Sequence, residues 1–155
     1  MRHAMHINPD NYLQTPAGRV TTPERNKLAW DQCYEALEAA VREASPSTKV
    51  YLLVGPQGSG KSTWARARSA ELSSDIYFDA IVVKRSERAQ VMQIVLPIGL
   101  RAVAVWFQSA LETCLARNAL RPADEIVAER ALRNVYAALE PPSIDEGFAD
   151  VLIVA

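Results

Sequence analysis

Features that would assign a protein class at once are scarce in this 155-residue sequence. There are two cysteines, Cys33 and Cys114, and their spacing matches neither a metal site nor a disulfide framework, so two free thiols are expected. No run reaches the roughly 18 apolar residues that a membrane span needs. The amino-terminal residues lack the apolar core of a secretion signal, so a cytoplasmic protein is expected.

An excess of one charge is also missing. The 17 lysines and arginines nearly balance the 18 aspartates and glutamates, which leaves a net charge of −1. The whole chain therefore has no general attraction to nucleic acid or to an anionic membrane, although a local basic patch remains open. The length suits one domain, or one domain with an appendage.

The first 48 residues are expected to lie outside the main domain. Residues 1–20 are polar and interrupted by prolines, which favours an extended N-terminal arm; His3 and His6 have no partner ligands there and are expected to be solvated. Residues 21–48 are expected to form a helix and a linker, because Thr21 and Glu24 have the spacing of a capping box.

That helix, expected over residues 21–44, has one apolar face. Its apolar residues recur at helical spacing: Trp30, Tyr34, Leu37 and Val41. We expect this stripe to pack on the domain. A surface for self-association or for a protein partner is the alternative.

Strands and helices alternate through the remaining domain, residues 49–155. Strands are expected at 50–54, 76–79, 101–107 and 150–154, and helices at 62–72, 85–96, 109–118 and 123–139. This alternation predicts an α/β fold of three layers, with a mainly parallel sheet between helices.

The most specific motif lies between the first strand and helix of that domain. Its residues fit the G-x-x-x-x-G-K-[ST] pattern of a phosphate-binding P-loop: Gly55, Pro56, Gln57, Gly58, Ser59, Gly60, Lys61 and Ser62, followed by Thr63. A strand that feeds such a turn into a helix directs backbone N–H groups and the helix dipole at one anion. Lys61 is expected to reach the β- and γ-phosphates, and Ser62 to ligate Mg²⁺. The motif therefore predicts a site for a nucleoside triphosphate.

A carboxylate is expected beside this loop. Asp79 follows the apolar strand 76–78, so it should lie at the sheet edge that holds ligands in parallel α/β folds. It could orient Mg²⁺ together with Ser62, or accept the proton of an attacking hydroxyl. The alternative is an aspartate that only caps the next turn.

Two arginines could close over a bound nucleotide. Arg117 and Arg121 are four residues apart, hence on one face if that segment is helical, and Pro122 favours a break directly afterwards. Mobile arginines stabilise the charge of a phosphoryl group in transfer. A solvated basic surface is the alternative.

Four segments of residues 51–155 resemble P-loop kinases of the polynucleotide-kinase-like group, which includes zeta-toxin-type enzymes. They are the P-loop, Asp79-Ala80, the strand 102–107 with the Arg117-Asn118-x-x-Arg121 pattern that follows it, and the Glu146-Gly147-Phe148 turn. The resemblance implies a P-loop NTPase fold, ATP and Mg²⁺, with Lys61, Asp79, Arg117 and Arg121 in catalysis. It also implies a hydroxyl acceptor on a nucleic-acid end, a nucleotide or a small metabolite.

The region that binds the acceptor in that group is shortened here. The arginine expected three residues after Asp79 is absent, and the sequence favours loss or merging of one strand–helix unit. Asp75 is a weak substitute. Arg85 and Arg88 could bind an acceptor phosphate or form a solvated helix face.

Two functions therefore remain open. The first is an ATP-dependent kinase, and the second is a nucleotide-binding regulatory or partner-binding module with weak NTPase activity. The shortened acceptor region and the appended helix favour the second. A guanine-specific switch is disfavoured, because no Asn-Lys-x-Asp motif follows a strand.

Overall fold

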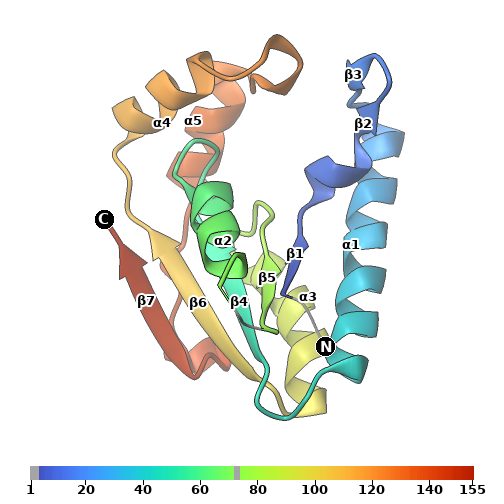
Figure 1. The fold of residues 1–155 in the computed structure, drawn as a ribbon. Coiled ribbons are helices and arrows are strands. Elements are labelled where there is room, and N and C mark those ends of the chain that lie inside the picture. The colour runs from blue at the N-terminus through green and yellow to red at the C-terminus, as the bar shows by residue number, and fades with distance from the viewer. Residues whose placement is uncertain (1–3, 72–73) are drawn as a thin grey trace.

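A parallel sheet forms the centre of the molecule (Figure 1). The computed structural model describes residues 4–71 and 74–155, and within them five parallel strands lie in the order β1-β5-β4-β6-β7. The strands are β1 (Met5–Ile7), β4 (Lys49–Val54), β5 (Ile76–Phe78), β6 (Arg101–Phe107) and β7 (Asp150–Val154). A short hairpin, β2 (Gln14–Thr15) and β3 (Gly18–Arg19), stands apart from this sheet. The predicted α/β fold with a parallel sheet is confirmed.

Helices cover both faces of the sheet. The α-helices are α1 (Pro23–Glu43), α2 (Lys61–Ser69), α3 (Arg85–Val95), α4 (Leu111–Ala119) and α5 (Glu129–Ala138). Short 3₁₀ turns are η1 (Pro9–Tyr12), η2 (Leu96–Ile98), η3 (Ala123–Glu125) and η4 (Ile144–Glu146). The expected end of α2, residue 72, lies outside the described residues.

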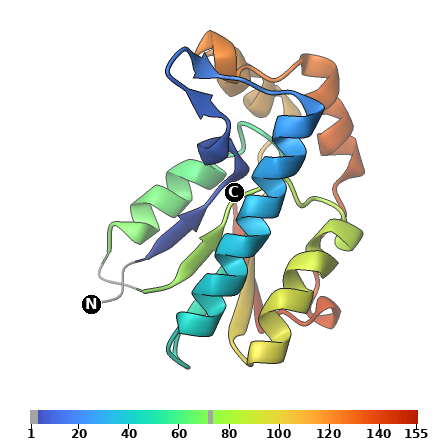
Figure 2. The ribbon, with the colours of Figure 1, turned by 90° about the vertical axis from the view of Figure 1, so that its right-hand side faces the viewer.

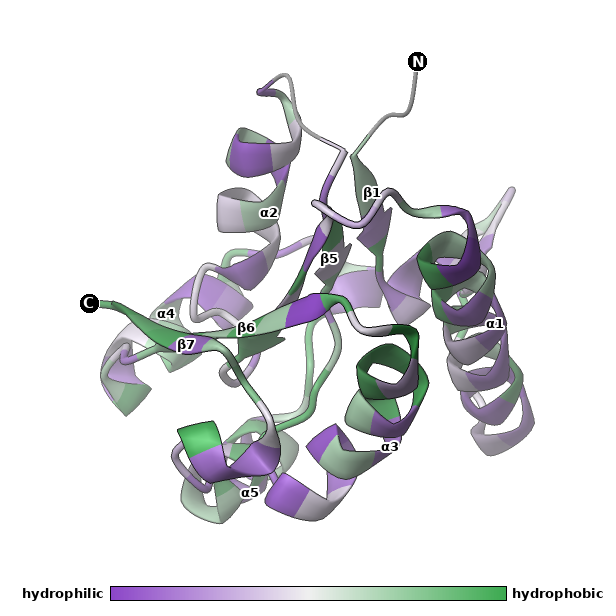
Figure 3. Cartoon of the chain, turned by 90° about the horizontal axis from the view of Figure 1, so that it is seen from below, coloured by the Kyte–Doolittle hydropathy of each residue, from purple (hydrophilic) through white to green (hydrophobic). Residues whose placement is uncertain are grey.

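Two apolar layers hold the helices to the sheet. One face of the strands packs against α1 and α3, which lie side by side in Figure 2. The opposite face packs against α2 through Ala65 and Trp64. Figure 3 shows these helices on opposite sides of the strands. Because β4 and β6 are covered on both faces, both strands consist almost entirely of apolar residues, as is typical of parallel sheets.

The apolar stripe of α1 lies against the sheet, as expected. Leu37 and Val41 are buried, and Trp30 and Tyr34 pack at the edge of the same core. The helix begins at Pro23, two residues later than predicted. The capping residue is Thr22 and not Thr21, because the hydroxyl of Thr22 accepts the backbone N–H of Arg25.

The expected N-terminal arm contributes a strand to the sheet, which corrects the prediction for its first residues. Met5–Ile7 pair in parallel with Ile76–Phe78, and the N–H of Asp79 donates to the carbonyl of Ile7 at 2.8 Å. The segment was missed because the strand is three residues long and contains a histidine where an apolar run is expected. The described N-terminal residues therefore belong to the same α/β unit as the P-loop strand.

The single helix expected over 123–139 is divided in two. Residues between η3 and α5 are extended, and the buried side chain of Asn118 binds both backbone polar groups of Val127, at 2.7 and 3.0 Å. This amide replaces the hydrogen bonds that a helix would have supplied there.

A buried ion pair fixes the turn before β7. Arg88 is fully buried and forms two hydrogen bonds with Glu146, at 2.8 and 3.1 Å, and two more with the carbonyls of Val82 and Val83. Arg85 pairs with the exposed Asp145. Neither alternative proposed for Arg88, an acceptor contact or a solvated face, agrees with this burial.

Among the described residues, no helix combines the length and the apolar character needed to cross a bilayer.

Arg88→Ala tests the importance of the buried pair. The substitution leaves the Glu146 carboxylate buried without its partner, so the free energy of unfolding should fall by about 3–5 kcal/mol in urea denaturation. Arg85→Ala, which removes an exposed pair from the same helix, is the control and should change stability little. Equal effects of the two substitutions would contradict a structural role for Arg88.

Candidate nucleotide-binding site

The P-loop connects the carboxyl end of β4 to the N-terminus of α2, and its shape requires glycine at two positions. Gly58 and Gly60 have φ angles of +76° and +100°, which residues with a side chain rarely adopt. A Cβ on Gly58 would also lie 2.6 Å from the carbonyl oxygen of Cys114. The loop can therefore curl tightly because these residues have no side chain.

Lys61 lies inside the curl of the loop. Its side chain is buried, and its Nζ donates to the carbonyl of Pro56 at 2.9 Å. Burial lowers the pKa of Lys61, although the nearby Asp79 carboxylate opposes that shift. An anion placed in the curl would give this desolvated ammonium a second charged partner.

The loop also contains buried polar atoms with no protein partner. Ser59 Oγ and Gln57 Oε1 are such atoms among the described residues. Buried polar groups are nearly always hydrogen-bonded, and exceptions call for an explanation such as a water, an ion or a ligand. Both residues line the cavity beside the loop, so this region fits a polar ligand.

Asp79 lies where three elements meet. Its Oδ2 accepts hydrogen bonds from Ser62 Oγ on α2 (2.6 Å), from His6 Nε2 on β1 (2.7 Å) and from Asn8 Nδ2 (3.2 Å). Burial disfavours the carboxylate, but the hydrogen bond from His6 and the charge of Lys61 outweigh it and hold the pKa of Asp79 below its usual value. An ionised carboxylate therefore stands next to the Ser62 hydroxyl.

Ser62 and Asp79 have the chemistry of a magnesium site. Mg²⁺ keeps several waters and takes few ligands from the protein, typically carboxylate and hydroxyl oxygens beside a substrate phosphate. The described residues contain no group of three or more His, Cys, Asp or Glu side chains placed to hold a metal. The pair therefore fits Mg²⁺ bound together with a nucleotide.

The two lid arginines both line the cavity but do not share a helix face. Arg117 lies in the last turn of α4 and donates to the carbonyl of Gly58 at 3.2 Å. The helix ends at Ala119, so Arg121 lies beyond it, in the turn before Pro122. The chain breaks before Pro122, as predicted, but the helix ends before Arg121, so Arg121 does not lie on the same helix face as Arg117.

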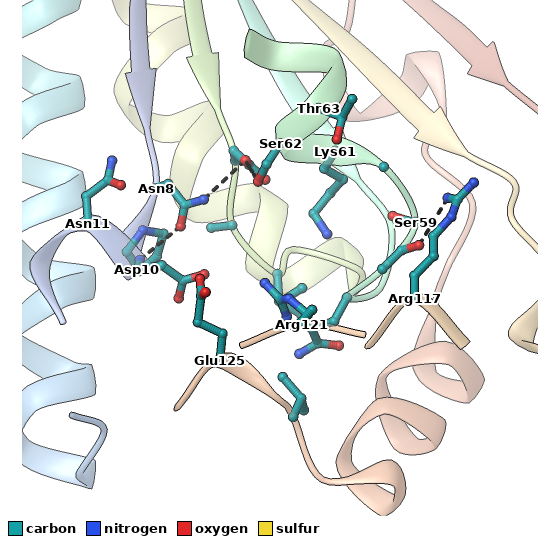
Figure 4. A pocket seen from close by; sticks show the side chains of 18 of the residues that line it. Asn8, Asp10, Asn11, Ser59, Lys61, Ser62, Thr63, Arg117, Arg121 and Glu125 are labelled. Atoms are coloured by element: carbon teal, nitrogen blue, oxygen red, sulfur yellow. Dashed lines mark hydrogen bonds between the residues drawn. The ribbon is translucent and has the colours of Figure 1, made fainter. Parts of the chain in front are cut away.

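These groups border a cavity of about 1430 Å³ (Figure 4). The P-loop, α2 and the two lid arginines form one side. The opposite side is formed by residues 6–30, including Asn8, Asp10 and Asn11. Pockets for single ligands commonly measure about 300–1,000 Å³, so the space exceeds what one nucleotide requires.

Polar contacts join two segments that line the cavity. The side chain of Arg19, on β3, lies 2.6 Å from Glu125 and 3.4 Å from Asp10. The backbone N–H of Arg19 also donates to Asp124 at 2.6 Å. The hairpin that precedes α1 is thus joined to the η3 turn that follows the lid arginines, as the proximity of these segments in Figure 1 illustrates.

Three other charged residues differ in their surroundings. Asp75 lies at the opposite end of β5 and accepts the N–H of Lys49, so it is no substitute acceptor residue. Arg68 stacks over Tyr51 and Trp64, whereas Arg66 lines the cavity.

The sequence pattern missed His6 and Asn8. Both belong to the segment expected to form an arm, and no local motif marks them as neighbours of a residue more than 70 positions away. The one available signal was an asparagine directly after a short strand, Asn8 after Ile7, and ordinary turns share that pattern.

The sequence was also compared with known proteins. No protein-family model and no curated protein matches this chain. The fold and the geometry of the site are therefore the basis for a functional conclusion.

Asp79→Asn tests the ionised state of this carboxylate. Folding lowers the pKa of Asp79, so the ionised carboxylate stabilises the fold at pH values above the pKa of the unfolded chain, about 3.9. This stabilisation is lost as the pH falls through the lower pKa of the folded protein. Urea denaturation at pH 5 and pH 3 should show a smaller loss of stability for Asp79→Asn than for the wild type. Asp31→Asn, at an exposed position on α1, should follow the wild type. A wild-type-like loss in Asp79→Asn would refute the assignment.

Proposed function

We propose that this protein is a Mg²⁺-dependent phosphotransferase that binds ATP at the P-loop and transfers its γ-phosphoryl group to a hydroxyl acceptor. One observation carries the proposal: Lys61, Ser62 and Asp79 meet at the wall of a cavity with room for a second substrate. The cavity volume is larger than that of a typical single-ligand pocket, which supports a site for two substrates.

The P-loop would hold the phosphates of ATP. Backbone N–H groups of residues 57–62 and the N-terminus of α2 supply donors and partial positive charge. On binding, the Lys61 ammonium would give up its hydrogen bond to the carbonyl of Pro56 and donate to phosphate oxygens inside the loop instead. The P-loop residues from Gly55 to Thr63 are thus assigned to the donor.

Asp79 is better suited to orienting Mg²⁺ than to acting alone as a strong base. A general base works best when its pKa lies near the working pH, whereas the pKa of Asp79 is lowered. When bound, Mg²⁺ supplies positive charge to the phosphate oxygens, and Ser62 and Asp79 are the residues that would hold it.

The transfer itself requires little covalent chemistry from the protein. The acceptor oxygen forms a bond to the γ-phosphorus while the bond to the β–γ bridging oxygen breaks, which releases ADP. The hydroxyl proton is released to solvent. Arg117 and Arg121 would stabilise the charge of the transferring group and exclude water.

The alternative of a regulatory nucleotide-binding module has less support than the sequence suggested. Its first argument was the appended helix, but the apolar stripe of α1 is occupied by the sheet. Its second argument was a missing strand–helix unit, but β1 and α1 supply such a unit beside β5. The enzymatic proposal is therefore preferred.

Lys61→Ala tests nucleotide binding. Loss of the ammonium should weaken ATP binding at least about tenfold in calorimetric titration with Mg²⁺, because a buried charge contact to phosphate is removed. Lys49→Ala is the matched control, since Lys49 is exposed at the opposite end of β4. Unchanged affinity in Lys61→Ala would sink the P-loop assignment.

Arg117→Ala tests the lid. The rate of transfer should fall about 10²–10³-fold while ATP affinity changes less than about threefold, since the arginine acts on charge that develops in the transition state. Arg133→Ala, an exposed arginine on α5, serves as the control. Parallel losses of affinity and rate would show that Arg117 serves ground-state binding instead.

A further inference from the structure

The side of the cavity opposite the P-loop has a chemical character of its own. It is built by the residues before α1 and by the first turns of α1, and its polar side chains are mostly uncharged: Asn8, Asn11, Gln14, Thr21 and Asn26. We call these residues, together with Asp10 and Arg19, the N-terminal wall. Figure 4 shows Asn8, Asp10 and Asn11 on the side of the cavity across from Lys61 and Arg121.

Uncharged amides suit a ligand rich in hydroxyl groups. Each asparagine or glutamine side chain offers two donors and an acceptor oxygen, and a hydroxyl group can use either. A site built to bind a phosphate uses arginine, lysine or clustered backbone N–H groups instead. The N-terminal wall has one such cation, Arg19.

The charge of Arg19 is offset by two carboxylates, although its buried Nε has no hydrogen-bond partner among the described residues. Its guanidinium pairs with Asp10 and Glu125, so these three side chains together carry one net negative charge. The other lysine and arginine side chains that line the cavity come from the opposite side: Lys61, Arg66, Arg117 and Arg121. Positive charge thus lies on the donor side and a slight negative charge on the other.

We propose that the N-terminal wall is the acceptor subsite and that the acceptor is a small, hydroxyl-rich molecule without a phosphate group, such as a polyol, a sugar or a nucleoside. This inference rests on the proposed kinase function. A nucleotide or a nucleic-acid end would bring phosphate toward Asp10 and Glu125, which repel it. The products are ADP and the phosphate monoester of the acceptor.

Matched pairs of acceptors test the chemical class. Each pair has the same skeleton with and without a phosphate: glycerol and glycerol 3-phosphate, ribose and ribose 5-phosphate, and adenosine and adenosine 3′-monophosphate. Transfer from [γ-³²P]ATP with Mg²⁺ gives kcat/KM for each. For the pair that the protein uses, the unphosphorylated member should be preferred at least about tenfold.

Two variants locate the subsite. Glu125→Gln removes one of the carboxylates around Arg19 and should reduce the preference for the unphosphorylated acceptor several-fold, whereas Glu112→Gln, exposed on α4, should not.

Asn11→Ala combined with Asn26→Ala should raise KM for the acceptor about tenfold with little change in KM for ATP. Both asparagines are exposed, so the fold should tolerate their loss.

The outcomes separate this inference from the kinase proposal. Preference for the phosphorylated members, or for a 5′-hydroxyl oligonucleotide, overturns the acceptor class and leaves the kinase intact. An unchanged acceptor KM in the double variant overturns the location of the subsite. Absence of transfer to every acceptor, with ATP bound, overturns the kinase proposal and this inference together.

Discussion

The hydrogen bonds to one carboxylate oxygen organise the candidate site. Asp79 Oδ2 accepts hydrogen bonds from His6 and Asn8 in the N-terminal segment and from Ser62 on α2. A buried carboxylate is costly unless donors surround it, so each of the three segments is held in place by the need to satisfy the same charge. The edge strand β1, its neighbour β5 and the glycine-rich loop before α2 therefore keep a fixed relation to one another.

The separation of charge across the cavity follows from this arrangement. Lys61, Arg117 and Arg121 bring positive charge to one side, which suits the polyphosphate of the proposed donor. The other side is built by a segment whose single lining arginine is already paired with two carboxylates. The two sides thus differ in the ligands that they can hold, which is the physical basis for assigning them to two substrates.

Much of this could be predicted from local sequence, because local patterns carry backbone information. The apolar runs of β4 and β6 predicted the parallel sheet, and the glycines of the motif predicted the tight turn between β4 and α2. Met5–Ile7 could not be recognised, because a three-residue strand has no measurable period and gains its stability from pairing with β5. Arg88 shows a second reason. The sequence identifies an arginine on a helix, for which a solvated or ligand-binding position is expected. Its burial depends on Glu146, a partner 58 residues away that no local pattern identifies.

The position of β1 has a consequence for how the chain acquires its structure. This strand is made before its hydrogen-bonding partner β5, which lies about 70 residues later in the chain. At about 5–20 residues per second, the N-terminal segment waits several seconds on the ribosome before that partner has been made. Because β1 occupies the outer edge of the sheet, it can dock last without disturbing the strands already paired. Assembly of the binding cavity then coincides with completion of the sheet, so a chain truncated before β5 would lack both.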